Sequence, residues 1–95
     1  MSDLIRANVA LLCMHTNADV VSRGVSDVIA QAVGLNHIAP IVDSGDGATG
    51  IGRYGVLPVQ TSLGELAQKL ATILPATVPG IQVSGEFGSL VRSVS

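Results

Sequence analysis

Two stretches of this chain repeat apolar residues at the spacing of an α-helix, and they limit the possible folds more than any other feature. The members of the first stretch are Val25, Val28, Ile29, Ala32 and Val33. They would line one helix face, and Gly34 suits the left-handed position just past its end. The second stretch, 63–74, starts after Ser62 with the pattern of a capping box and stops at Pro75. Each helix therefore needs a surface that covers its apolar face.

Short apolar segments before, between and after these helices supply that surface as β-strands. The predicted strands are 8–15, 37–42, 51–59, 80–84 and 90–94. The last two flank a turn at 85–88 and predict a hairpin. The order is then β-α-β-β-α-β-β, which favours an α/β (α+β) two-layer sandwich. We expect a mixed sheet with two helices on one face, close to a split βαβ arrangement.

The chain is long enough for a single domain, 1–95, and its core must be almost purely aliphatic. Its 95 residues are 47% apolar, but only 2% are aromatic. Two helices cover one face of the predicted sheet, so the other face stays open. We expect that face to be buried against more chain or against another subunit.

Charge and cysteine content exclude several functions. The net charge is −2 and the five basic residues are scattered, so no nucleic-acid partner is expected. The longest apolar run, Val9 to Met14, is too short to span a membrane. It also makes a poor signal peptide, since Asp3 lies in the would-be basic region. The single cysteine, Cys13, fits a reducing compartment, so we expect a cytoplasmic protein with Cys13 buried in the apolar run.

The glycine-rich segment 50–55, Gly-Ile-Gly-Arg-Tyr-Gly, matches the dinucleotide fingerprint, but its surroundings do not. That fingerprint requires a strand before it and a helix after it. Here a loop precedes the segment and Val56-Leu57-Pro58 follows as strand. The pattern therefore predicts a strand whose glycines allow a bulge or a close backbone approach. The loop 43–50 lacks the spacing of a calcium loop and is expected to be an exposed turn.

One segment carries chemistry at the end of a predicted strand: His15-Thr16-Asn17-Ala18-Asp19. A carboxylate at Asp19 is a hard oxygen ligand for a divalent metal, and His15 could ligate or orient it. The alternative is a turn in which Asn17 and Asp19 cap local backbone amides. Local chemistry leaves the two interpretations open. The other histidine, His37, follows a helix end and is expected to be structural.

Several segments, in order, resemble the dinuclear-metal-centre hexameric protein family (Nif-three-like, or GTP cyclohydrolase type two homologue). The segment 15–19 is similar to its His-Thr-Asn-x-Asp element. Gly24-Val25-Ser26-Asp27 opens a helix that ends in Gly34-Leu35, and segment 50–55 with Leu57-Pro58 matches its glycine–arginine strand. Thr61-Ser62-Leu63 with Glu65-Leu66 resembles the start of its next helix. The matches span residues 4 to 94.

The resemblance implies that Asp19 is a metal ligand and that His15 stands beside the metal as a supporting group. It also implies a divalent cofactor (zinc, manganese or iron), a homo-oligomer in the form of a hexamer, and two-domain subunits. The activity it implies is that of a metal-dependent hydrolase, GTP cyclohydrolase-like in some relatives.

The chain also departs from the family pattern, which has paired histidines upstream and a His-x-x-x-Glu segment downstream. Neither is present, since the only histidines are His15 and His37. A two-metal site needs ligands on both ions, so we expect an incomplete metal site and an inactive isolated chain, an internal portion of a larger subunit. No catalytic or cofactor-binding residue is assigned. The alternative is a non-catalytic oligomerisation or ligand-binding module of split βαβ type; a nucleotide-binding module is a third.

Overall fold

A computed structural model describes residues 1–95 as four helices and five strands. The helices are α1 Ser2–Arg6, α2 Asn17–Val20, α3 Val25–Val33 and α4 Leu63–Ile73. The strands are β1 Asn36–Ala39, β2 Val42–Asp43, β3 Gly50–Ile51, β4 Tyr54–Ser62 and β5 Leu90–Val94. The chain is therefore mixed α/β, as expected, but its element order is not the predicted one. No helix has the length and apolar character needed to cross a membrane.

The strands form two small sheets, and every pairing is antiparallel. β1, β4 and β5 make a three-stranded sheet with β4 in the centre, while β2 and β3 form a separate pair. The prediction of one mixed sheet was therefore wrong. The hairpin of 80–84 with 90–94 was also wrong, since 80–84 is irregular and β5 pairs with β4 instead.

The two helices predicted from periodicity are confirmed as α3 and α4. Gly34 ends α3 in the left-handed conformation, with φ of 86°. At the start of α4, Ser62 and Glu65 form both hydrogen bonds of the capping box. Lys69 of α4 donates from Nζ to the carbonyl of Val33 at 2.5 Å, which satisfies a terminal carbonyl of α3 and ties the two helices together.

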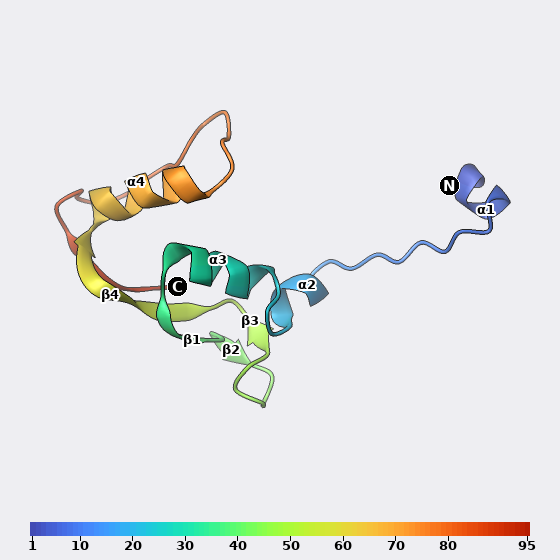
Figure 1. The fold of residues 1–95 in the computed structure, drawn as a ribbon, viewed down its shortest axis with the longest axis horizontal. Coiled ribbons are helices and arrows are strands. Elements are labelled where there is room, and N and C mark those ends of the chain that lie inside the picture. The colour runs from blue at the N-terminus through green and yellow to red at the C-terminus, as the bar shows by residue number, and fades with distance from the viewer.

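A small aliphatic core lies where α3 and α4 meet the three-stranded sheet (Figure 1). Its buried members are Ala30, Val33, Leu35, Leu57 and Leu66. None of them is aromatic, as the composition predicted. Twenty large hydrophobic side chains remain exposed, so this core covers only part of the apolar surface.

The apolar run 8–15 is not a buried strand. It leads from α2 away from the rest of the fold to α1 and has no regular structure beyond residue 8 (Figure 1). Leu12 is 81% exposed, and Cys13 is exposed rather than buried. An apolar strand is buried when neighbouring strands pair with it. None of the strands β1 to β5 pairs with the run 8–15.

Candidate functional site

The predicted ligand Asp19 lies on α2, a single helical turn that packs against α3 and β3. Its side chain is half-buried. His15 is exposed just before this turn, and its Nδ1 lies 3.3 Å from the Thr16 hydroxyl. The structure thus places Asp19 on the folded part of the chain, while His15 is the last residue of the irregular run 8–15.

The alternative role of these side chains, capping of local amides, has little support in the geometry. The N-cap of α2 is Thr16, and no side-chain hydrogen bond caps the helix. The amides of Asp19 and Val20 instead donate to the Thr16 carbonyl oxygen, each at 3.1 Å. The turn is therefore closed by backbone groups, and its conformation does not require the Asp19 carboxylate.

Arg53 holds this turn in place through hydrogen bonds, although the sequence indicated only that it is one of five scattered basic residues. The Arg53 side chain is 3% exposed. Its Nη2 donates to the carbonyls of Val20 and Val21 at 3.3 Å, at the end of α2. Its Nη1 donates to the carbonyls of Gly50 and Gly52 at 2.7 Å each. One guanidinium therefore joins α2 to the glycine segment 50–55 through rigid, planar hydrogen-bonding geometry.

Asp27, in the first turn of α3, neutralises this buried cation. One oxygen accepts the Nε–H of Arg53, and the other accepts the Arg23 amide at 2.5 Å. The Asp27 side chain is 14% exposed. The hydrogen bond from Arg53 lowers the pKa of Asp27 below its ordinary value, and the Arg23 amide adds to the effect, while burial opposes it. The pair therefore locks α2, α3 and β3 into one unit.

Two glycines allow the backbones around Arg53 to come close. A Cβ at Gly24 would lie 2.2 Å from the Ala18 carbonyl oxygen, and one at Gly50 would lie 2.0 Å from that of Val42. Both distances are far below contact, so only glycine fits. The glycines of 50–55 thus serve close backbone approach, as predicted, and no helix follows them to bind a pyrophosphate.

The acidic loop 43–50 satisfies its own carboxylates, as expected of a turn. Asp43 accepts the amides of Gly45 and Gly47, at 2.7 and 3.0 Å. Asp46 accepts the amides of Thr49 and Ala48 and the Thr49 hydroxyl, and these bonds lower the pKa of Asp46 to about 2. Both carboxylates of the loop therefore accept hydrogen bonds that stabilise the turn itself.

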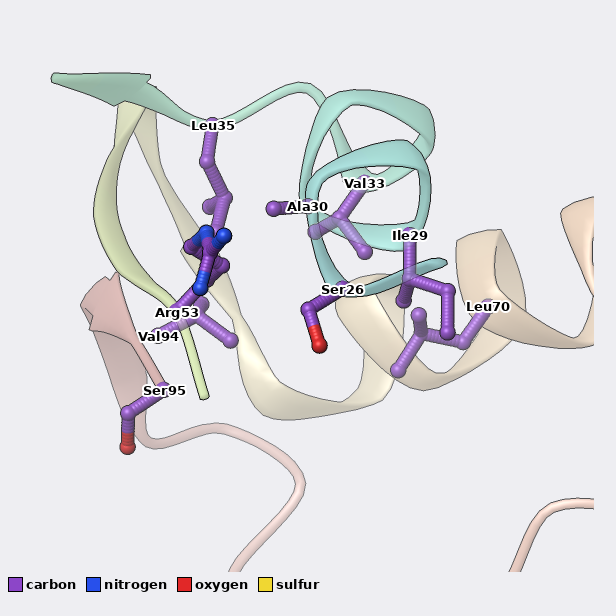
Figure 2. Close-up of a pocket in the computed structure, with 9 residues that line it drawn as sticks. All are labelled: Ser26, Ile29, Ala30, Val33, Leu35, Arg53, Leu70, Val94 and Ser95. Carbon is purple, nitrogen blue, oxygen red and sulfur yellow. The ribbon is translucent and has the colours of Figure 1, made fainter. Parts of the chain in front are cut away.

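Two hollows lie next to Arg53. A polar one of about 320 Å³ is bordered by α3, β1 and loop 43–50 and includes Arg23, Asp27 and Gln31. An apolar one of about 290 Å³ lies between α3, α4 and β5 (Figure 2). In Figure 2 the Arg53 side chain stands between Leu35 and Val94, with Ile29 and Leu70 across the space. Its other polar side chains are only Ser26 and Ser95, so this hollow continues the core and offers no catalytic group.

The side chains of this chain do not by themselves fit a resident metal. No group of three or more His, Cys, Asp or Glu residues is placed to hold an ion. A structural or catalytic metal takes three or more protein ligands in most sites, and Asp19 supplies one. No reaction step through a metal is derived from these residues.

Sequence reasoning missed Arg53 and Asp27 as the residues that fix the candidate site. Both lie inside segments quoted for the family resemblance, Gly24 to Asp27 and 50–55. An arginine flanked by glycines in an apolar strand was the available signal, because an unpaired buried guanidinium would be strongly destabilising.

These observations define a class: small α/β proteins that present a half-buried carboxylate from a turn hydrogen-bonded to a buried arginine. The chain belongs to the Duf34/NIF3 (NGG1p interacting factor 3) family, whose model matches residues 1–95.

Curated relatives agree with this assignment. The chain is 43% identical over 95 residues to a "GTP cyclohydrolase 1 type 2 homolog" of Streptomyces coelicolor. The aligned region covers 97% of this chain and 33% of the relative. It is 42% identical over 67 residues to the protein of the same name from a Nostoc species, covering 70% of this chain and 25% of the relative. The chain thus spans a third or less of the length of these relatives. No solved structure matches it.

Proposed function

We propose that this chain is the part of a Duf34/NIF3 protein that presents Asp19 as one ligand of a divalent metal: zinc, manganese or iron. The remaining ligands would come from residues other than these 95. The observation that carries the proposal is the state of Asp19, a half-buried carboxylate that the turn does not need, on a backbone fixed by Arg53. A ligand held in this way loses little freedom when a metal binds.

His15 has a supporting role in this proposal. An imidazole beside a metal-binding carboxylate can orient it by hydrogen bonding. His15 is exposed and precedes α2 by two residues, so it is free to turn towards the metal once the run 8–15 is fixed. We place it beside the metal and not among its ligands.

The whole protein would be a cytoplasmic metal-dependent hydrolase that assembles as a homo-oligomer, a hexamer in the full-length family. The relatives' name, GTP cyclohydrolase 1 type 2 homolog, points to a nucleotide substrate. Asp19 would help to hold the metal, which would supply Lewis-acid activation for hydrolysis once its other ligands are in place. The isolated chain has one proposed ligand, so we expect it to be catalytically inert.

Isothermal titration of the 95-residue chain with zinc or manganese tests whether the metal site needs ligands from other residues. We expect weak binding without defined stoichiometry, because one carboxylate does not hold a divalent ion against water. A tight isotherm with two stoichiometric sites would contradict the proposal.

The Asp19→Asn variant tests the ligand itself in a chain extended to the length of the family relatives. The change keeps the size of the side chain and removes its charge, so we expect lost metal content by elemental analysis. Asp3→Asn, at a residue 93% exposed on α1, is the matched control and should keep its metal. Unchanged metal content in Asp19→Asn would reject Asp19 as a ligand.

A second candidate function is a non-catalytic oligomerisation or ligand-binding module. The exposed apolar side chains favour it, among them Leu12, Val59 and Leu90. Under this proposal Asp19→Asn leaves metal content unchanged and the chain still self-associates, so the same variant separates the two functions.

A further inference from the structure

The peptide group between Ala18 and Asp19 packs directly against Gly24, the N-cap of α3. A Cβ at Gly24 would lie 2.2 Å from the Ala18 carbonyl oxygen and 2.8 Å from that of Val21. The Gly24 amide also donates to the Val21 carbonyl at 3.0 Å, which closes the turn between α2 and α3. The absence of a side chain at Gly24 thus sets how near the backbone before Asp19 lies to the start of α3.

If the space at Gly24 were filled, α2 would move and α3 would stay in place. A Cβ needs about 1 Å more separation than it would find there. α3 is anchored through two core residues, Ala30 and Val33, and through the ion pair of Asp27 in its first turn. By contrast, α2 is four residues long and has no buried residue. The displacement would therefore fall on α2 and on its carboxylate, Asp19.

A shift of about 1 Å is large for a metal ligand. Bond lengths to a metal are held within about 0.2 Å, and a binding site keeps its groups within about 0.5 Å of their working geometry. Arg53 also prevents the turn from adjusting as a whole, because its Nη2 holds the carbonyls of Val20 and Val21 at 3.3 Å. Asp19 thus lies in a short turn that is restrained before it by Gly24 and after it by Arg53.

We propose that Gly24 is a positioning residue for Asp19: its missing side chain lets the peptide group of the ligand lie close to α3, where the carboxylate is placed for the metal. The inference rests on the proposed function, since it takes Asp19 to be a metal ligand. Gly24 has no side chain that could touch the metal, so its effect passes through Asp19. The contacts involved join residues of this chain to each other, so they do not depend on what covers its surface.

A double-mutant cycle in a chain extended to the length of the family relatives separates positioning from general stability. Its members are the parent, Gly24→Ala, Asp19→Asn and the double variant, and the Kd for zinc is measured by competition with a chromophoric chelator. We expect Gly24→Ala to weaken zinc binding by about 10- to 100-fold, the range for groups that orient a ligand. In the Asp19→Asn background the same change should have no further effect, because no charged ligand is left to displace.

Two controls show whether a loss of zinc binding is specific to the turn. Leu66→Ala removes a core side chain from α4, which lies away from α2 (Figure 1). It should lower the unfolding midpoint and leave the Kd of the folded protein unchanged. Gly88→Ala adds the same methyl group where no atom lies within 4 Å and should change neither quantity.

Circular dichroism shows whether each variant is folded under the conditions of the titration. If Gly24→Ala does not fold, Arg53→Lys takes its place in the cycle. Lysine cannot hold the carbonyls of Val20 and Val21 as the planar guanidinium does, so it releases the same turn without added bulk. The expected pattern is the same: weaker zinc binding in the parent, and no further loss beside Asp19→Asn.

The cycle distinguishes a failure of this inference from a failure of the proposed function. An equal loss from Gly24→Ala in both backgrounds would overturn the inference alone, because Gly24 would then act on the fold and not through Asp19. A zinc Kd that Gly24→Ala leaves unchanged would overturn it in the same way. If Asp19→Asn binds zinc as tightly as the parent, the proposed function is wrong, and the positioning role of Gly24 is wrong with it.

Discussion

The Asp27 carboxylate accepts the Nε–H of Arg53 across 26 positions of sequence, and this pair joins the start of α3 to the glycine segment that leads into β4. Because Arg53 also donates to Val20 and Val21, the pair determines where α2 and its Asp19 lie. The position of the proposed metal ligand thus depends on two residues that would not touch the metal.

Replacement of Arg53 by lysine tests this dependence. Lysine keeps the charge but has no planar fork, so it cannot bond α2, Asp27 and the glycine carbonyls at once. We expect Arg53→Lys to lower the free energy of unfolding by about 3 kcal/mol, as for a broken buried pair. Urea unfolding followed by circular dichroism measures the change. Arg92→Lys, at an exposed position of β5, is the control and should be near neutral; equal losses in both variants would contradict the role of Arg53.

Asp27 should make stability depend on pH in the acid range. Its pKa is lowered from 3.8 in the folded state by Arg53, so the folded chain binds fewer protons than the unfolded chain in this range. The stabilisation is complete above pH of about 4, the unfolded pKa, and is lost as the pH falls through the lowered folded pKa. Unfolding midpoints measured from neutral to acid pH should therefore fall below this point.

Asp27→Asn is the comparison for that titration. It should be less stable than the parent at neutral pH, and the difference should shrink as the pH drops, because the parent loses its charged partner. A constant difference at every pH would mean that the Asp27 charge contributes nothing.

Asp46 offers a second titration, on an exposed loop. The amides of Thr49 and Ala48 hold its pKa at about 2. We expect its carboxyl carbon resonance, and the amide resonances of both partners, to titrate together near that value. An unperturbed aspartate has a pKa of about 3.9, so the lowered pKa of Asp46 should be clear in this experiment. An Asp46 midpoint at the unperturbed value would show that the loop bonds do not persist in solution.

Local sequence patterns predicted the parts of the fold that local interactions determine. The apolar stripe and Gly34 located α3, and the Ser62–Glu65 pattern located the start of α4, because caps and helical periodicity act within a few residues. Pairing of β5 with β4 was missed, since it joins Leu90 to Ser62 across a helix, and the nearby turn at 85–88 favoured a hairpin. A strand's partner is set by the whole fold.

The run 8–15 and Arg53 show the same limit at the candidate site. Composition identifies a segment that prefers a strand, but burial of Leu12 or Cys13 requires a partner that composition does not specify. Arg53 looked like one scattered charge, because its six hydrogen bonds go to residues up to 33 positions away. Asp19 was singled out from a motif, and the structure added that Arg53 donates hydrogen bonds to the end of its turn, at Val20 and Val21. Its role as a ligand stays a prediction.

The capping box of α4 should contribute measurably to stability. The Ser62 hydroxyl accepts the Glu65 amide at 3.2 Å, and a Glu65 carboxylate oxygen accepts the Ser62 amide at 3.2 Å. Ser62→Ala removes the first bond, so we expect a loss of about 1 kcal/mol in the free energy of unfolding. Ser44→Ala, in the exposed loop, is the control. A Ser62→Ala variant as stable as the control would show that backbone contacts alone fix the helix start.

Gly50 is the position where added bulk should do the most damage to the region around Arg53. A Cβ there would lie 2.0 Å from the Val42 carbonyl oxygen, and Gly50 has φ of 151°, so β2 and β3 would have to separate. The Gly50 carbonyl is also a partner of Arg53, and its movement would weaken that bond. We expect Gly50→Ala to cost more than about 1 kcal/mol. Gly88→Ala, with open space around it and no left-handed backbone, is the matched control and should be near neutral. If both alanines were tolerated equally in urea unfolding, the β2–β3 pair would not be holding the glycine segment against the arginine.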